Sequence, residues 1–213
     1  TGYTDANKFA ERLDIDGVNK KDGTKAIIVN SPNNPSGVVY SEETIKSLCE
    51  VLARKEKEYG KTIYLIADEP YRELVYSSTF VPYLMNYYDN TIVCYSYSKA
   101  LSLPGERIGY IAVNPKATDG TDIYLAICGA GRSLGYVCAP SMFQQIIAKC
   151  INAKVDVNVY KENRDILYGN LTDFGYECVK PDGAFYLFVK SPSGDATELY
   201  ERAKKHEVLV FPC

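Results

Sequence analysis

The chain has 213 residues, of which 46% are hydrophobic and 24% are charged, and its formal net charge is -3. A chain of this size and composition can bury a substantial core, and its small negative charge gives no reason to expect nucleic acid or an anionic membrane surface as a partner. No apolar run approaches the roughly 20 residues that a membrane-spanning helix needs.

The first predicted unit is a strand, a helix and a second strand. The run AIIVN at 26–30 has the character of a buried strand and leads into a loop with two prolines and a glycine, 31–37. A helix follows from Ser41 to Tyr59, because Ser41 can cap it, glutamates occupy its first turn, apolar residues recur on one face and Gly60 ends it. The apolar run 63–67 is the next strand, so the helix is a crossover between parallel strands.

A third strand is predicted at 91–95 and a fourth at 108–113. The fourth follows too closely for a crossover helix, so we expect it to pair antiparallel with the third. The chain then predicts helices between Tyr124 and Cys150 that break near Gly135 and Pro140. A long helix and a small α+β unit follow, with the elements at 155–174 (helix), 182–189 (strand), 197–206 (helix) and 208–211 (strand).

Polar side chains follow the carboxyl ends of the three strands that are expected to be parallel. Asn34 comes after the first, Asp68 and Tyr71 after the second, and Lys99 and Arg107 after the third. In an open α/β sheet the ligand lies outside these ends, so the groups are expected to converge on one crevice. The alternative for Asp68 is that it forms a turn or caps a helix. The alternative for Lys99 is a surface position, and for Arg107 a structural role, in a loop rich in serine and glycine.

Of the three strand ends, the third carries the residues that indicate a particular chemistry most specifically. In a closed cleft the pKa of the Lys99 amine falls, and the free amine can attack a carbonyl to form a Schiff base. The planar fork of Arg107 suits a phosphate, and the hydroxyls of Ser96 and Ser98 add donors beside it. An amine next to a phosphate clamp suggests pyridoxal phosphate as the cofactor.

Several ordered motifs carry a resemblance to a known family. Asn34-Pro35-Ser36-Gly37 is similar to an Asn-Pro-Thr-Gly loop, 68–71 to Asp-x-x-Tyr, and 96–109 to Ser-x-Ser-Lys followed by Gly-x-Arg-x-Gly. In this order and spacing the chain resembles class I/II aminotransferases of the aspartate aminotransferase family, the fold-type I pyridoxal phosphate enzymes. The resemblance runs from about Ala26 to the last residue.

The resemblance implies an α/β fold with a mostly parallel sheet whose last strand is antiparallel. Residues 1–155 would be part of the large, cofactor-binding domain. Residues 156–213 would be the linking helix and part of a small α+β carboxyl-terminal domain. It also implies an enzyme that moves an amino group between an amino acid and a 2-oxo acid, and that forms a cytoplasmic homodimer with neither nucleic acid nor membrane as a partner.

The resemblance further assigns roles to residues. Lys99 would hold the cofactor as a Schiff base and move the proton of the substrate's alpha carbon, Asp68 would keep the pyridine nitrogen protonated, and Tyr71 with Asn34 would bond the phenolic oxygen. Lys99, Asp68 and Tyr71 are thus the expected catalytic residues. The expected cofactor-binding residues are Asn34, Asp68, Tyr71, Ser96, Ser98, Lys99 and Arg107.

Two alternatives to a transaminase stay open on this evidence. A lyase, decarboxylase or cyclopropane-forming synthase uses the same lysine, aspartate and arginine, and a cofactor-sensing regulatory domain fused to a DNA-binding module shares the fold. The family also needs a phosphate loop and a ring-stacking aromatic upstream of Thr1, and an arginine for the substrate's carboxylate beyond Cys213. We therefore expect the chain to be the central and later part of a longer enzyme, and to be inactive alone.

The remaining conspicuous residues favour structural interpretations. The seven cysteines are irregularly spaced and the single histidine, His206, has no metal-ligating partner in the sequence, so free thiols and no metal site are expected. The tyrosines at 83, 87 and 88 are expected to pack in or at the rim of the core. The glycine-rich segment 129–135 lacks the features of a phosphate loop and is expected to be a loop near the active site or a dimer partner.

Overall fold

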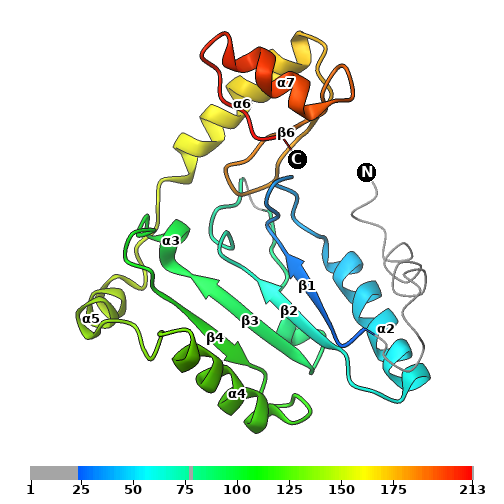
Figure 1. Ribbon diagram of the computed structural model, residues 1–213, viewed down its shortest axis with the longest axis vertical. Helices are drawn as coiled ribbons and strands as arrows, with labels where there is room; N and C mark the ends of the chain where they lie inside the picture. The colour runs from blue at the N-terminus through cyan, green and yellow to red at the C-terminus, as the bar shows by residue number, and fades with distance from the viewer. Residues whose placement is uncertain (1–23, 77–78, 213) are drawn as a thin grey trace.

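The computed structural model describes residues 24–76 and 79–212 (Figure 1). Its main sheet has the strand order β1 (Ala26–Asn30), β2 (Tyr64–Asp68), β3 (Thr91–Ser96) and β4 (Gly109–Val113). The first three strands are parallel and β4 is antiparallel to β3, as the short connection predicts. The arrowheads in Figure 1 show that β1, β2 and β3 end at the same edge of the sheet.

Helix α2 (Glu42–Tyr59) covers one face of this sheet. It begins where the Ser41 hydroxyl accepts a hydrogen bond from the Thr44 amide, and it ends at Gly60, whose φ of 64° lies in the left-handed region. Its buried residues Ile45, Leu48 and Leu52 pack in one core cluster with the strand residues Val29, Leu65, Ala67 and Val93. Each fully buried aliphatic side chain of this kind stabilises the fold by about 1.5–3 kcal/mol.

The opposite face of the sheet is more open in the described part of the chain. Ile28 of β1 is 70% exposed and Ile111 of β4 is 51% exposed, while Val29, the neighbour of Ile28 on the α2 face, is buried. Because side chains alternate along a strand, Asn30, Asp68 and Cys94 project on the same side as Ile28. The register aligns Asn30 with Asp68, and Asp68 with Cys94, in one row across the three parallel strands.

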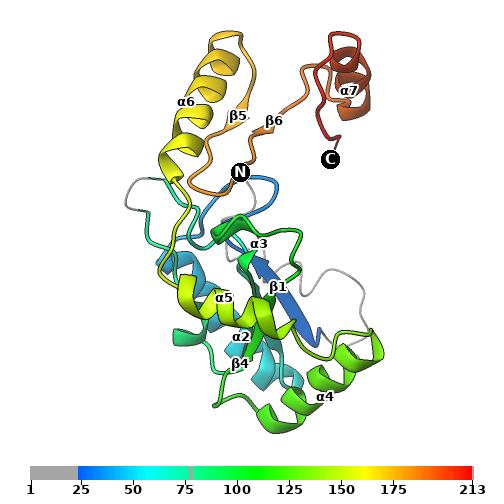
Figure 2. The same ribbon diagram turned by 90° about the vertical axis from the view of Figure 1, so that its left-hand side faces the viewer.

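Short elements complete this part of the fold. The one-turn helices η2 (Leu84–Asn86) and α3 (Tyr97–Ala100) flank β3, and α4 (Gly120–Ser133) and α5 (Ser141–Cys150) follow β4 and lie beside it (Figure 2). Tyr88 is in the main core and Tyr83 and Tyr87 pack against it, as expected. The expectation of a loop at 129–135 was wrong, because residues 129–133 continue α4 and only its end at Gly135 turns away.

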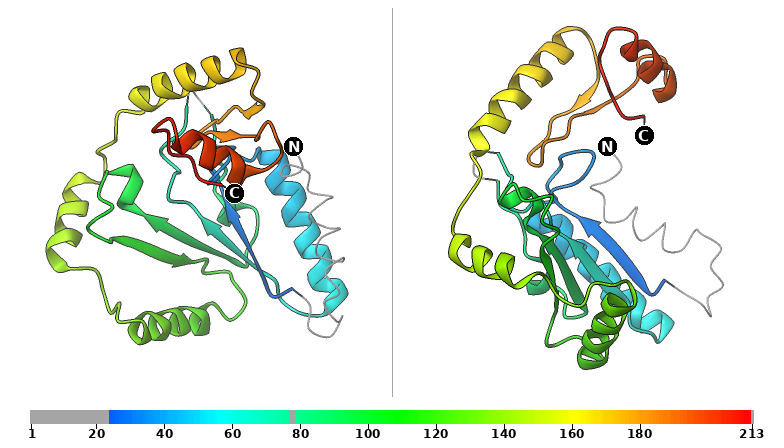
Figure 3. Two further views of the ribbon diagram at one scale, coloured as in Figure 1. Left: turned by 45° about the horizontal axis from the view of Figure 1, so that its top comes forward. Right: turned by 60° about the vertical axis from the view of Figure 1, so that its left-hand side comes forward.

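The carboxyl-terminal part comprises α6 (Val157–Asp173), β5 (Cys178–Val179), β6 (Phe188–Val189) and α7 (Ala196–Lys204). It lies beyond the carboxyl ends of β1, β2 and β3 (Figures 1 and 3). The strand expected at 182–189 is reduced to Phe188–Val189, paired with β5, and an isolated bridge between Gly183 and Val75. The division into two domains near residue 155 stays a prediction.

The strand expected at 208–211 was wrong. Within residues 24–76 and 79–212 this segment forms no strand, and Phe211 is 93% exposed. An apolar run becomes a strand only when a neighbouring strand satisfies its backbone groups, and in the described structure this segment pairs with neither β5 nor β6.

Three further findings concern the described residues as a whole. None of their helices combines the length and the apolar character that crossing a membrane requires. Their cysteines are free thiols. No group of three or more potential metal-ligating side chains gathers anywhere in this part of the chain.

Candidate functional site

Asp68, the last residue of β2, is held by an asparagine on the neighbouring strand. The Asn30 amide nitrogen donates to the Asp68 carbonyl oxygen at 2.9 Å and to its carboxylate Oδ2 at 3.1 Å. The amide oxygen of Asn30 accepts from the backbone N–H of Asn34 at 2.6 Å. Two of the expected cofactor-binding residues, Asn34 and Asp68, are therefore joined through a third residue.

The electrostatic surroundings of Asp68 are unusual for a carboxylate. Burial raises its pKa above the ordinary value. No ion pair links it to a basic side chain within the described ranges 24–76 and 79–212. Its neighbours Cys94 and Tyr71 are both neutral acids, and the charge of Asp68 helps to raise their pKa values. Asp68 thus presents a partly desolvated negative charge that lacks a cationic partner.

Tyr71, three residues further on, is buried and makes a long-range contact. Its hydroxyl lies 2.7 Å from the hydroxyl of Tyr186, which is 115 residues away in the sequence. Burial, followed by the Tyr186 hydrogen bond, raises the pKa of Tyr71, while a hydrogen bond from the Asn34 side chain acts in the opposite direction. Tyr71 is therefore a neutral hydrogen-bonding group at neutral pH, in reach of both Asn34 and the carboxyl-terminal part of the chain.

Lys99 approaches the same tyrosine from the third strand. It lies on α3, one turn after β3 ends, and its Nζ is 5.9 Å from the centre of the Tyr71 ring and 5.1 Å from that of Phe185. Such contacts between an ammonium and aromatic faces are weak, about 0.5–1 kcal/mol at exposed sites. No carboxylate forms an ion pair with Lys99 in the part of the chain that the structure describes. Within the described residues, the amine of Lys99 therefore has no carboxylate bound to it and is available to another group.

The expected phosphate-binding residues lie around the β3–β4 connection. The Ser96 hydroxyl caps α3 by accepting from the Ser98 amide at 3.1 Å, and it donates to the Ser98 hydroxyl at 2.6 Å. Arg107 is exposed, has a left-handed φ of 50°, and donates to the Pro104 carbonyl at 3.0 Å. Among the described residues no hydrogen bond joins Arg107 to either serine. The geometry thus brings the two serines together and leaves Arg107 on the adjacent loop.

Gly109 fixes the start of β4 close to β3. A Cβ at this position would lie 2.3 Å from the carbonyl oxygen of Tyr95, a distance that real Cβ atoms do not adopt. Ser96 pairs with Gly109 in the antiparallel register, so the glycine allows the loop that carries Arg107 to return directly beside α3. This is the physical reason for the last glycine of the Gly-x-Arg-x-Gly pattern.

Three loops interlock through their backbones above the strand ends. The Gly37 carbonyl accepts from the amides of Asp182 and Gly183 at 2.8 and 2.9 Å. The Leu74 carbonyl accepts from the Ala184 amide at 2.7 Å, and a Cβ on Gly183 would lie 2.6 Å from that same carbonyl. These contacts set Phe185 and Tyr186 against Tyr71, with edge-to-face ring arrangements at 5.6 Å for both pairs.

Sequence reasoning missed Asn30, Phe185 and Tyr186. The position of Asn30 could have marked it as a site residue, because it is the last residue of its strand and ligands bind outside the carboxyl ends of parallel strands. Phe185 and Tyr186 lay inside a segment interpreted as a plain strand, and nothing local indicates that they turn back to β2. Only the tertiary contacts bring them to the site.

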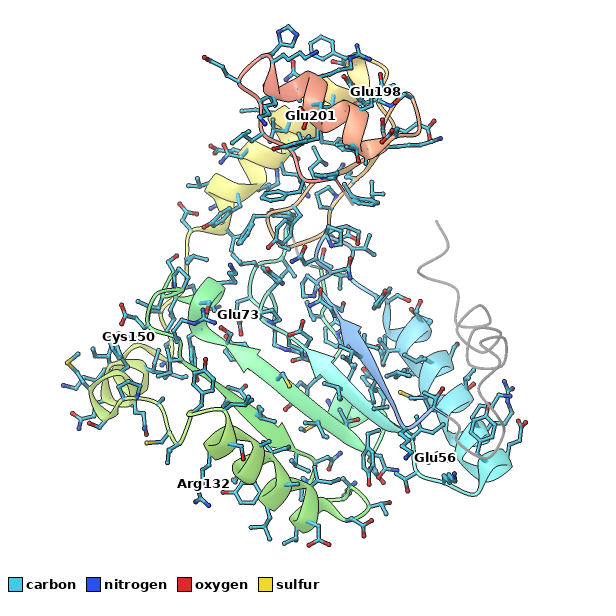
Figure 4. The ribbon with its side chains drawn as sticks, viewed as in Figure 1. Glu56, Glu73, Arg132, Cys150, Glu198 and Glu201 are labelled. Atoms are coloured by element: carbon cyan, nitrogen blue, oxygen red, sulfur yellow. The ribbon has the colours of Figure 1, made fainter. Side chains whose placement is uncertain are left out.

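Of two further charged residues, Glu73 and Arg132, only Glu73 lies close to α3, the helix that carries Lys99. Figure 4 places Glu73 close to α3 and Arg132 on α4, away from α3. One carboxylate oxygen of Glu73 is buried without a hydrogen-bond partner in the described part of the chain. Arg132 is exposed, and it is not part of the cluster around Lys99.

The assembled cluster defines a class of site at the carboxyl end of a mostly parallel α/β sheet. It contains a primary amine and a carboxylate, neither of which forms an ion pair within the described residues, together with neutral hydroxyl and amide donors. The comparisons agree with this description. The chain belongs to the family of class I and II aminotransferases, whose model matches residues 3–213. The resemblance drawn from the motifs is thereby confirmed, as is the fold class.

Individual relatives make the match more specific. A probable aspartate aminotransferase from Methanocaldococcus jannaschii is 32% identical over 198 residues, which cover 89% of this chain and 50% of that protein. The crystal structure of an amino transferase from Eubacterium rectale is 56% identical, with a TM-score of 0.89 over 98% of this chain and 51% of the other. The crystal structure of the aspartate aminotransferase from Thermotoga maritima is 29% identical, with a TM-score of 0.73 over 92% of this chain and 50% of the other. The chain spans about half the length of the relatives it matches.

Proposed function

We propose that this chain supplies the catalytic lysine and the cofactor contacts of a pyridoxal-phosphate-dependent aminotransferase, which moves an amino group between an amino acid and a 2-oxo acid. The observation that supports this most directly is the position of the Lys99 amine. It lies against the rings of Tyr71 and Phe185 without a carboxylate partner in the described residues, and Tyr71 is linked in turn to Asn34.

The residues fit this cofactor in charge and in hydrogen-bonding character. When bound, pyridoxal phosphate condenses with primary amines and acts as an electron sink for the substrate's alpha carbon. The unpaired carboxylate of Asp68 suits a protonated ring nitrogen, because it lacks a cation of its own. The Tyr71 hydroxyl and the Asn34 amide are neutral donors for an anionic phenolic oxygen.

The protein's own groups then have distinct tasks in the proposed reaction. The Nζ of Lys99 would provide the amine to which the cofactor is attached and, when not so engaged, would carry the proton to and from the substrate's alpha carbon. The Asp68 carboxylate would favour a protonated ring nitrogen. Ser96, Ser98 and Arg107 would bind the phosphate, for which Arg107 must turn its guanidinium from the Pro104 carbonyl to the anion.

The names of the relatives support transamination over the alternative lyase, decarboxylase, synthase and sensor functions. Five of these relatives are named aspartate, aspartate/prephenate or N-acetyl-LL-diaminopimelate aminotransferases, or putative aminotransferase. Aspartate is therefore the first amino donor to test, with a panel of 2-oxo acids as acceptors. We also propose a homodimeric, cytoplasmic enzyme with small-molecule substrates as its partners.

Large apolar side chains that are exposed on α4 and α5, such as Tyr124, Leu125 and Met142, support the proposed dimer, since such a surface is usually covered by protein. Sedimentation velocity of the complete protein tests this assembly. A monomer at micromolar concentration would contradict it.

The function is tested by trapping the cofactor and then locating it. The complete protein is mixed with pyridoxal phosphate, reduced with borohydride, digested and analysed by mass spectrometry. Modification is expected at Lys99, and Lys99→Ala should lose both the modified peptide and the long-wavelength absorption band of the attached cofactor. Lys116→Ala is the matched control, because it removes an exposed lysine on another loop.

Activity is measured on the complete protein with aspartate and the panel of 2-oxo acids. Transamination is expected in the wild-type protein and in Lys116→Ala, whereas Lys99→Ala should lose several orders of magnitude in rate. Specific labelling of other lysines with Lys99 unmodified, or normal turnover of Lys99→Ala, would contradict the proposal.

A further inference from the structure

Asn30 has no role in the proposed reaction, although its side chain makes three hydrogen bonds within the strand-end cluster. Asn30 uses both ends of its side-chain amide: the nitrogen donates twice to Asp68, at 2.9 and 3.1 Å, and the oxygen accepts from the Asn34 N–H at 2.6 Å. The orientation of the amide is fixed, because a backbone N–H can only donate and so must face the oxygen.

We propose that Asn30 is a positioning residue that keeps Asp68 ionised and correctly oriented, and that ties the Asn34 loop to the same strand end. This inference rests on the proposed function for the roles of Asp68 and Asn34. Asn30 itself need not touch the cofactor, since it acts through the two residues that would.

The backbone explains why this position can serve both residues. Asn30 and Asp68 are direct partners in the parallel register of β1 and β2, and their side chains lie on the same face of the sheet. Asn34 is only four residues beyond Asn30, where the loop turns back over the strand end. A rotation of the Asn30 side chain would therefore release the carboxylate and the loop together.

The chemistry requires an amide rather than another small polar group. A carboxylate at position 30 would still accept from the Asn34 N–H, but it would place a second acceptor and a second negative charge 3.1 Å from Asp68 Oδ2. Two titratable groups in the described structure respond to the charge of Asp68, namely Cys94 on β3 and Tyr71 beyond β2, and their raised pKa values keep both neutral at pH 7. Asn30 is therefore the side chain whose donor favours the charged form of a carboxylate that burial disfavours.

The test compares Asn30→Asp with Asn33→Asp in the same loop. Asn33 accepts through its side-chain oxygen from the Ser36 amide and hydroxyl, contacts that an aspartate retains. Its side-chain nitrogen donates to the backbone carbonyl of Asn30, at 3.3 Å, so Asn33→Asp loses a backbone contact but leaves the Asn30 side chain and its hydrogen bonds to Asp68 in place. Asn30→Ala is a third variant that removes the donor without adding charge. Circular dichroism establishes that each variant is folded.

The first measurement is the titration of Asp68 in the cofactor-free chain, followed by carbon-13 NMR of labelled aspartate carboxyls and assigned with Asp68→Asn. In Asn30→Asp the two carboxyls are expected to share a proton, so that the proton affinity of the pair rises about tenfold or more over that of wild-type Asp68. Asn30→Ala should raise it less, and Asn33→Asp should leave it unchanged. Equal titration of Asp68 in Asn30→Asp and Asn33→Asp would overturn the inference.

The second measurement is the affinity of the complete protein for pyridoxal phosphate near pH 8, by equilibrium dialysis. Asn30→Asp is expected to bind at least about tenfold more weakly than wild type, because a protonated or displaced Asp68 no longer offers a full charge to the ring nitrogen. Affinity equal to that of Asn33→Asp would also overturn the inference. If wild type fails to bind at all, the proposed function fails, while the NMR titration still decides the role of Asn30.

Discussion

Gly37 offers a sharp test of how the site is built, because its backbone connects the first loop to the carboxyl-terminal part of the chain. Its φ of 69° lies in the left-handed region, and an added Cβ would lie 2.3 Å from the Pro181 Cβ and 2.9 Å from the Gly183 carbonyl oxygen. Gly60 provides the matched control: its φ is 64°, and nothing lies within 4 Å of an added Cβ. The perturbation is an alanine at each position.

The magnitudes follow from these two environments. An alanine in the left-handed region costs about 1–2 kcal/mol, and both variants incur this cost. Only Gly37→Ala also forces a methyl group into packed backbone, which costs about 1–3 kcal/mol more. We therefore expect Gly60→Ala to lose about 1–2 kcal/mol of unfolding free energy and Gly37→Ala about 2–5 kcal/mol.

Urea unfolding followed by circular dichroism measures both losses, and subtracting one from the other isolates the contact with Pro181 and Gly183. Because that contact holds the loop with Phe185 and Tyr186 in place, Gly37→Ala should also change the ring environment of Tyr71, which near-ultraviolet circular dichroism detects. Equal losses in the two variants, to within about 0.5 kcal/mol, would refute the view that these loops are rigidly interlocked.

Two further predictions concern Asp68 and Tyr186. Burial raises the pKa of Asp68, so the folded chain binds this proton more tightly than the unfolded chain, and stability falls as pH rises through the interval between the two pKa values. Asp68→Asn should therefore raise the unfolding free energy at pH 7. The gain should shrink by at most about 1.4 kcal/mol per pH unit as the pH is lowered through that interval. Urea unfolding at a series of pH values measures the gain, and a gain independent of pH would contradict this reasoning. Tyr186→Phe removes the partner of the Tyr71 hydroxyl, so we expect a loss of about 0.5–1.5 kcal/mol and a lower pKa of Tyr71 in an ultraviolet titration. An unchanged Tyr71 titration would show that the two hydroxyls do not interact in solution.

The sequence by itself determined the local elements of this protein. Helix α2 could be predicted to within a residue, because Ser41 and Gly60 satisfy its ends and its apolar residues repeat at the helical period. The antiparallel pairing of β4 followed from the length of its connection to β3. The order of the residues at the strand ends, Asn34, Asp68, Tyr71 and Lys99, indicated the family. Each of these features is carried by short segments of the chain and by their order along it.

The tertiary structure alone decided which of those residues meet, and through what. The Asn30–Asp68 pair depends on the register of two strands 38 residues apart, and the Tyr71–Tyr186 contact spans 115 residues. The apolar run at 208–211 has strand-like residues but pairs with no strand in the described structure, and Phe211 stays exposed. Periodicity and capping record hydrogen bonds and burial within an element, whereas register and loop docking depend on packing between elements, which no local pattern encodes.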